Sequence, residues 1–186
     1  PLPAVVNARK ALDPEAPLES DGLDSAPFVT LRAFVAAVAG RTDPVKVQLT
    51  GPATLAAALI DAGAPPEVAL PVATAAVRAR ARDVLDAVAA SAPAAPVLAV
   101  IDEPAMVDGP PPSVGPLDVV IDAVSTALAA VEPRAITGIH CCGSADWKAL
   151  LQAGPNLLSA PVDADFGPGS AAVAGFLEWG GWIAWG

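Results

Sequence analysis

The sequence predicts an α/β fold built on a parallel sheet, and three observations lead to that prediction. Short apolar runs of strand length alternate along the 186 residues with longer stretches of helical period, which is the pattern of βαβ units. The run at 96–101 is apolar throughout, as expected of a strand that is buried on both faces. Polar residues directly follow several of the runs, where both barrels and doubly wound sheets collect their functional groups.

Six runs have the length and composition of strands. The clearest is at 45–49, where apolar and polar side chains alternate with the period of a strand that has one exposed face. The weakest lies around Val5 and is followed by an acidic, Pro-containing stretch, 10–28, that predicts a loop. In chain order, the predicted strands are the run around Val5 and those at 45–49, 96–101, 136–142, 157–162 and 182–185.

The segments between these runs have helical periodicity and recognisable stop signals. Thr30 and Ser144 are predicted to cap two of the helices, and Gly40 and Gly154 to end them. Pro71 is predicted to mark the start of a helix or a break within one. The predicted helices cover about 31–39, 53–62, 66–91, 117–131, 144–151 and 170–178.

The composition argues against several classes of partner. The formal net charge is −10, which disfavours nucleic acid or an anionic membrane as a binding partner. The chain has no uninterrupted run of about 18 apolar residues, so no membrane span is expected, and no signal peptide is visible. Its two cysteines are adjacent and make a poor disulfide framework, so a reducing, cytoplasmic location is expected.

The only histidine and the only two cysteines are consecutive, at the end of the run that begins at Ile136. In a strand, successive side chains point to opposite faces, so His140 and Cys142 share one face and Cys141 points the other way. A neutral imidazole and a thiolate on one face make half of a typical zinc site. The alternative is structural: two small buried cysteines and a polar histidine that closes the strand.

Other polar residues occupy the same kind of position. Thr50, Asp102 with Glu103, and Asp163 each follow the end of a predicted strand, and the carboxyl ends of parallel strands meet at one edge of a sheet. No G-x-G-x-x-G follows a strand, so a dinucleotide site is not expected, and neither a P-loop nor a G-x-S-x-G is present. Asp102 and Glu103 before Pro104 could also form a turn that contacts no ligand.

Four segments together resemble the cobalamin-independent methionine synthase family. They are VKVQLTGPATLA at 45–56, VIDEPAM at 100–106, GIHCCG at 138–143 and VDAD at 162–165, and they occur in the family's order. The family belongs to a wider group with uroporphyrinogen decarboxylase and the zinc-dependent methylcobalamin:thiol methyltransferases. The resemblance implies a (β/α)8 TIM barrel, of which residues 1–186 form a single, partial catalytic-type domain. Because a closed barrel has eight strands, the missing N-terminal βα units would precede Pro1 and the missing C-terminal end would follow Gly186.

The resemblance also implies roles for individual residues. His140 and Cys142 match two zinc ligands of the family, and Asp163 lies where a third ligand, usually Glu, is expected. A fourth ligand, a Cys beyond the last strand, has no counterpart here, so weakened or absent zinc binding by this chain is expected. Asp102 of the D-E-P turn would hold the amino group of homocysteine, and Glu103 is placed beside it in the substrate site.

The function that the resemblance implies is zinc-dependent transfer of a methyl group to the thiol of homocysteine, which forms methionine. A thiol bound to zinc is deprotonated at neutral pH, and the thiolate is the nucleophile that methyl transfer needs. The methyl donor stays open between molecules such as methyltetrahydrofolate and methylcobalamin. Two alternatives are a uroporphyrinogen decarboxylase-like enzyme, which needs no metal, and a truncated barrel that is not catalytic.

Overall fold

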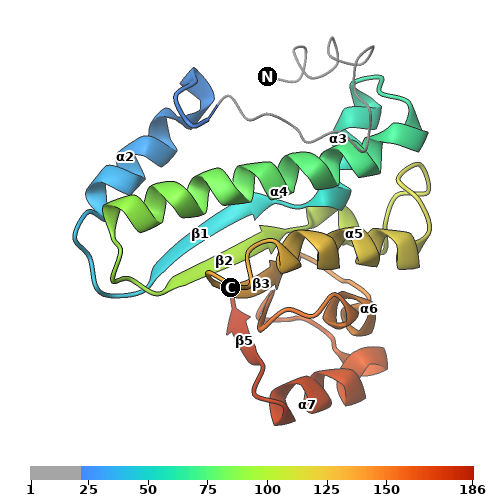
Figure 1. Cartoon of the computed structure of the whole chain (residues 1–186). Helices are drawn as coiled ribbons and strands as arrows, with labels where there is room; N and C mark the ends of the chain where they lie inside the picture. The colour runs from blue at the N-terminus through green and yellow to red at the C-terminus, as the bar shows by residue number, and fades with distance from the viewer. Residues whose placement is uncertain (1–21) are drawn as a thin grey trace.

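A single sheet of five parallel strands runs through residues 22–186, the part of the chain that this computed structural model describes (Figure 1). The strands are β1 (Val45–Thr50), β2 (Val97–Asp102), β3 (Ile136–His140), β4 (Leu157–Ala160) and β5 (Trp182–Trp185). Neighbours in the sheet are also consecutive in the sequence, and every pairing is parallel. The predicted α/β fold with a parallel sheet is therefore confirmed. The weak strand predicted around Val5 lies outside the described residues.

Helices separate all consecutive strands, as the sequence predicted. They are α2 (Val29–Ala37), α3 (Pro52–Asp61), α4 (Pro66–Ser91), α5 (Leu117–Ala129), α6 (Trp147–Gln152) and α7 (Ser170–Glu178), with short 3-10 turns η2 (Ala26–Phe28), η3 (Pro104–Met106) and η4 (Gly167–Gly169). Within residues 22–186 the strand order does not reverse, whereas a doubly wound sheet has a point at which it does. Within residues 22–186, no helix is both long and apolar enough to cross a membrane.

Two predicted helix caps are wrong, and both errors have a local cause. Helix α2 begins one residue earlier than Thr30, directly after the η2 turn, so Thr30 lies inside the helix. Helix α6 is capped by Asp146, whose side chain accepts a 2.9 Å hydrogen bond from a backbone N–H in the first turn, and not by Ser144.

Pro71 neither starts nor ends α4 but lies inside it, near the N-terminal end, where its ring removes one N–H donor.

The two faces of the sheet differ in how they are covered. Along β1 the odd-numbered side chains are buried and the even-numbered ones are exposed. The buried face packs against helices, and α4 and α5 lie across it in Figure 1. At its centre Ile101, Ile139 and Leu158 are fully buried. The opposite face, here called the open face, carries the even-numbered side chains of β1 and their register partners, and it is exposed at its edges, at Gln48 and Trp182.

Candidate functional site

The carboxyl ends of the strands bring four polar side chains into one line on the open face. The register pairs Thr50 with Asp102, Asp102 with His140, and His140 with Ser159. Register partners on neighbouring parallel strands point to the same side of the sheet and are separated by about 4.8 Å. This carboxyl-end row, which Ala184 of β5 completes, therefore places Asp102 beside His140, as the sequence predicted from their positions at strand ends.

Two hydrogen bonds between neighbouring strands hold the row, and each involves a residue that the sequence analysis did not single out. Gln48 Nε2 donates a 2.9 Å hydrogen bond to Asp102 Oδ1, from β1 to β2. His140 Nδ1 lies 3.1 Å from Ser159 Oγ, between β3 and β4. Gln48 was recognisable in principle, because it lies two residues before Thr50 and therefore on the same face of its strand, and Ser159 because it is the one polar residue in an apolar run. The carboxylate and the imidazole are thus each oriented by a neutral neighbour.

Glu103 follows Asp102 directly but has no exposed surface. Its Oε1 accepts a 3.0 Å hydrogen bond from the backbone N–H of Ala53, and its Oε2 accepts hydrogen bonds from the backbone N–H and the hydroxyl of Thr54, at 2.9 and 2.7 Å. These donors belong to the first turn of α3, whose own cap residue, Gly51, offers no side chain. Glu103 therefore caps α3 from a neighbouring strand end, and its predicted contact with a substrate stays a prediction.

The environment of Glu103 favours its neutral form. The pKa of this carboxyl group is raised to about 7. Burial is the largest cause, hydrogen bonds from Thr54 and Ala53 offset part of the rise, and the adjacent charge of Asp102 adds to it. Glu103 also explains why Gly51 is a glycine, since a Cβ at that position would overlap the Glu103 carboxylate and the side chain of Ile101. The T-G-P and D-E-P motifs are therefore parts of one packed unit, in which Gly51 connects β1 to α3 beside the Glu103 carboxyl group.

The two adjacent cysteines have opposite environments. Cys141 is fully buried in the core, whereas Cys142 is exposed, and both are free thiols. Burial raises the pKa of the Cys141 thiol, so this residue is a weak nucleophile and a poor metal ligand. Strand β3 ends at His140, two residues earlier than predicted, so Cys142 lies in the following bend. Alternation along a strand does not extend to the two cysteines, so the shared face of His140 and Cys142 stays a prediction.

Asp163 does not complete a metal site with these residues. Strand β4 ends at Ala160 and not at Val162 as predicted, so Asp163 lies in the turn beyond it and is exposed. In the part of the chain that the structure describes, no three His, Cys, Asp or Glu side chains are close enough to hold one ion together. His140, Cys142 and Asp163 therefore do not form the three-ligand zinc site that the resemblance implies, and the arrangement does not fit that metal.

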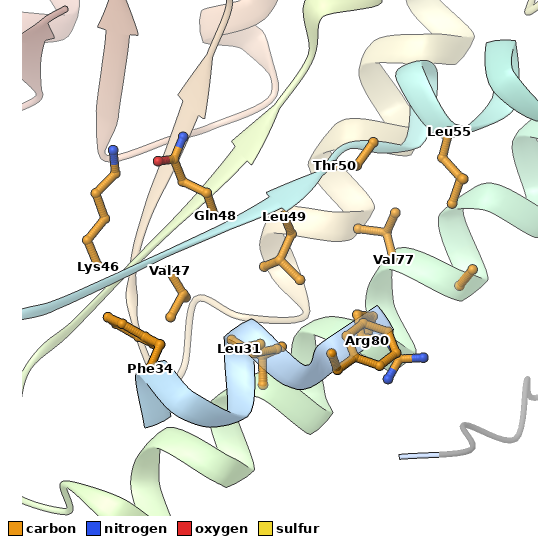
Figure 2. Close-up of a pocket in the computed structure, with 13 residues that line it drawn as sticks. Leu31, Phe34, Lys46, Val47, Gln48, Leu49, Thr50, Leu55, Val77 and Arg80 are labelled. Atoms are coloured by element: carbon orange, nitrogen blue, oxygen red, sulfur yellow. The ribbon is translucent and has the colours of Figure 1, made fainter. Parts of the chain in front are cut away.

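A cavity of about 520 Å³ lies beside the sheet, along the edge of β1 that pairs with no other strand of residues 22–186. Figure 2 shows its lining: apolar side chains from α2 and α4 on one side, and β1 on the other. Lys46 and Gln48 point away from α2 in this view, while Val47 points toward it. The cavity reaches the carboxyl-end row at Thr50, and Gln48 also lines it, but neither Asp102 nor His140 does.

Comparison of the chain with protein-family models, curated proteins and solved structures gives no match. The site itself offers an oriented carboxylate at Asp102, an imidazole at His140 with one ring nitrogen bonded to Ser159, and an exposed thiol at Cys142. Together they can pair with a cationic group, accept or donate a proton, and bind or react through sulfur.

Proposed function

We propose that this chain is part of a methyltransferase barrel that transfers a methyl group to the thiol of homocysteine and forms methionine. The observation that carries the proposal is the carboxyl-end row, in which Asp102 and His140 lie side by side on the open face. Four segments that resemble the methionine synthase family supply these residues or the turns beside them. We place the protein in the cytoplasm, where the Cys142 thiol stays reduced.

The barrel itself is part of the proposal, and two features support it. The sequential order of five parallel strands is the order that a (β/α)8 barrel requires, with three further strands needed to reach eight. Apolar side chains are exposed at both edges of the sheet, at Phe34 beside β1 and at Trp182 and Trp185 on β5. A sheet that continued on both sides would cover them, and an uncovered edge invites association.

In this proposal the Asp102 carboxylate pairs with the ammonium group of homocysteine, and the thiol extends toward the neighbouring strand. His140 takes the thiol proton at Nε2, the ring nitrogen that Ser159 does not contact. The sulfur then forms a bond to the methyl carbon, and the donor leaves with the electron pair of the bond that breaks. Fixing the amino group and the base on adjacent strands restricts the thiol to the reactive orientation.

Zinc takes no part in these steps. A stable zinc site uses three or four protein donors, and the described residues do not bring a third donor to this pair. The chemistry above therefore uses the protein's own side chains. The methyl donor, methyltetrahydrofolate or methylcobalamin, is left to experiment. No arginine lies in the carboxyl-end row to hold the carboxylates of a porphyrin, so the decarboxylase alternative gains no support.

Calorimetry tests the binding step. The purified chain should bind homocysteine and discriminate against propanethiol, which lacks the amino group. Asp102→Asn should weaken homocysteine binding by about ten- to a hundredfold, the scale of a charge-assisted pair, and should leave propanethiol unaffected. Asp43→Asn makes the same chemical change in the exposed loop before β1 and should have no effect. Equal binding of both thiols by the wild type would contradict the assignment of Asp102.

A second candidate function is a barrel that binds a small amine or thiol without transferring a methyl group. The observation in its favour is that the predicted zinc ligands do not come together in the described residues. A single-turnover assay separates the two candidates, with homocysteine and either methylcobalamin or methyltetrahydrofolate. Methionine formation that depends on His140 supports the enzyme, whereas tight homocysteine binding with no methionine from either donor supports the binding protein.

A further inference from the structure

We infer that Gln48 is a positioning and specificity-determining residue, which holds the Asp102 carboxylate as an unneutralised acceptor for an amino group. The inference rests on the proposed function and deepens it, because it assigns the residue that selects an amine ligand. Gln48 lies on β1, two residues before Thr50, and its side chain reaches across to β2, where Nε2 is 2.9 Å from Asp102 Oδ1. A carboxylate only accepts hydrogen bonds, so the amide nitrogen of Gln48, and not its oxygen, has to face it.

The charge of Asp102 has no cationic partner in the described part of the chain. The two ion pairs found within residues 22–186 join Arg80 to Asp83 and Arg134 to Asp86. Lys46 is the one lysine or arginine among the open-face residues of the five strands. It lies four residues before Thr50 on β1, which places its backbone about 13 Å along the strand from the carboxyl-end row.

A neutral donor at position 48 has a consequence that a basic residue would not have. The hydrogen bond from Gln48 fixes the plane of the carboxylate and satisfies Oδ1, but it adds no positive charge. Oδ2 therefore stays available, and the negative charge stays uncompensated, on a face that is partly open to solvent. A ligand with a primary ammonium group gains a charge-assisted hydrogen bond there, whereas the same ligand without the amino group gains nothing.

The separation of Asp102 and His140 limits the size of the ligand. Asp102 and His140 are register partners on adjacent strands, so the acceptor and the imidazole are one strand spacing apart at the backbone, about 4.8 Å. An α-amino acid with a short side chain that ends in a thiol or hydroxyl matches this separation. The substrate class is therefore a small amino acid with an uncharged side chain, recognised through its ammonium group.

Calorimetry on the full chain tests this with L-homocysteine, its hydroxyl analogue L-homoserine, and propanethiol. Gln48→Ala should weaken both amino acids by roughly three- to tenfold and leave propanethiol unchanged. Gln48→Lys should weaken them more, because the introduced ammonium group pairs with Asp102 itself. Lys46→Ala, two residues earlier on the same face of β1, is the matched control and should change nothing.

A double-mutant cycle separates positioning from a general effect on folding. If Gln48 acts through Asp102, Gln48→Ala should cost nothing further once Asp102→Asn is present. The inference would be overturned if Gln48→Ala weakened ligand binding as much in Asp102→Asn as in the wild type. It would also be overturned if Lys46→Ala weakened binding as much as Gln48→Ala does. Homocysteine binding that no change at Gln48 affects would overturn it while leaving the proposed function standing. Amino-acid binding that depends on Gln48, with no methionine formed, would support the inference and refute the methyltransferase, and no binding of either amino acid would refute both.

Discussion

Replacing Glu103 with Gln tests the packed unit beneath the carboxyl-end row. The wild-type carboxyl group receives three hydrogen bonds, from the backbone N–H groups of Ala53 and Thr54 and from the Thr54 hydroxyl. Gln keeps the shape but turns an amide N–H toward at least one of these donors, so one bond is lost and one buried donor is left unpaired. Leaving a buried donor unpaired costs about 1–3 kcal/mol, which is a large part of the stability of a domain.

The effect of this substitution should depend on pH. Burial raises the pKa of Glu103 from 4.5 to about 7, so the folded chain binds a proton more tightly than the unfolded chain. A raised pKa contributes stability that is fully present below pH 4.5 and is lost as the pH rises to 7. The substituted glutamine cannot titrate, so the stability gap between wild type and Glu103→Gln should be about 2–3 kcal/mol larger at about pH 5 than at about pH 8.

Urea unfolding followed by circular dichroism at the two pH values gives this gap directly. Glu178→Gln makes the same chemical change at the exposed end of α7 and is the matched control, which should leave the stability close to that of the wild type. A gap that is equal at both pH values would mean that burial does not perturb Glu103. A gap that is larger at the higher pH would mean that the three donors hold the carboxylate ionised, and the reasoning from burial would be wrong.

Two further predictions follow from the same region. Gly51→Ala should destabilise the fold by about 1–3 kcal/mol in urea unfolding, because the added Cβ overlaps the Glu103 carboxylate, whereas Gly175→Ala in α7, where a Cβ meets nothing, should not destabilise it. A thiol reagent should modify one cysteine in the native chain and two after unfolding; Cys142→Ser should abolish the native reaction, and equal native reactivity of Cys141 would contradict its burial.

The secondary structure could largely be predicted from the sequence, because it depends on local periodicity. The bounds of α4, α7 and β5 agree with the predicted ranges 66–91, 170–178 and 182–185. The predicted caps at Thr30 and Ser144 failed for a different reason. A cap depends on the conformation of the preceding turn, and the composition of the helix does not reveal that conformation.

The candidate site could be predicted only in part. The positions of Asp102 and His140 follow from the rule that parallel strands present their carboxyl ends at one edge. The capping role of Glu103 could not be predicted, because its partner Thr54 is 49 residues away and the contact depends on how β2 packs beside α3. Asp163 was misplaced relative to its strand because the apolar residues Pro161 and Val162 continue the strand pattern into a turn.

Nuclear magnetic resonance of His140 tests most directly whether the carboxyl-end row is the homocysteine site. The chain has one histidine, so its imidazole gives a single set of signals that needs no assignment by mutation. Titration with homocysteine should shift both ring-nitrogen signals in a saturable way, and the midpoint should move to higher concentration in Asp102→Asn. Imidazole signals that stay unchanged while calorimetry reports binding would show that homocysteine binds elsewhere on the protein.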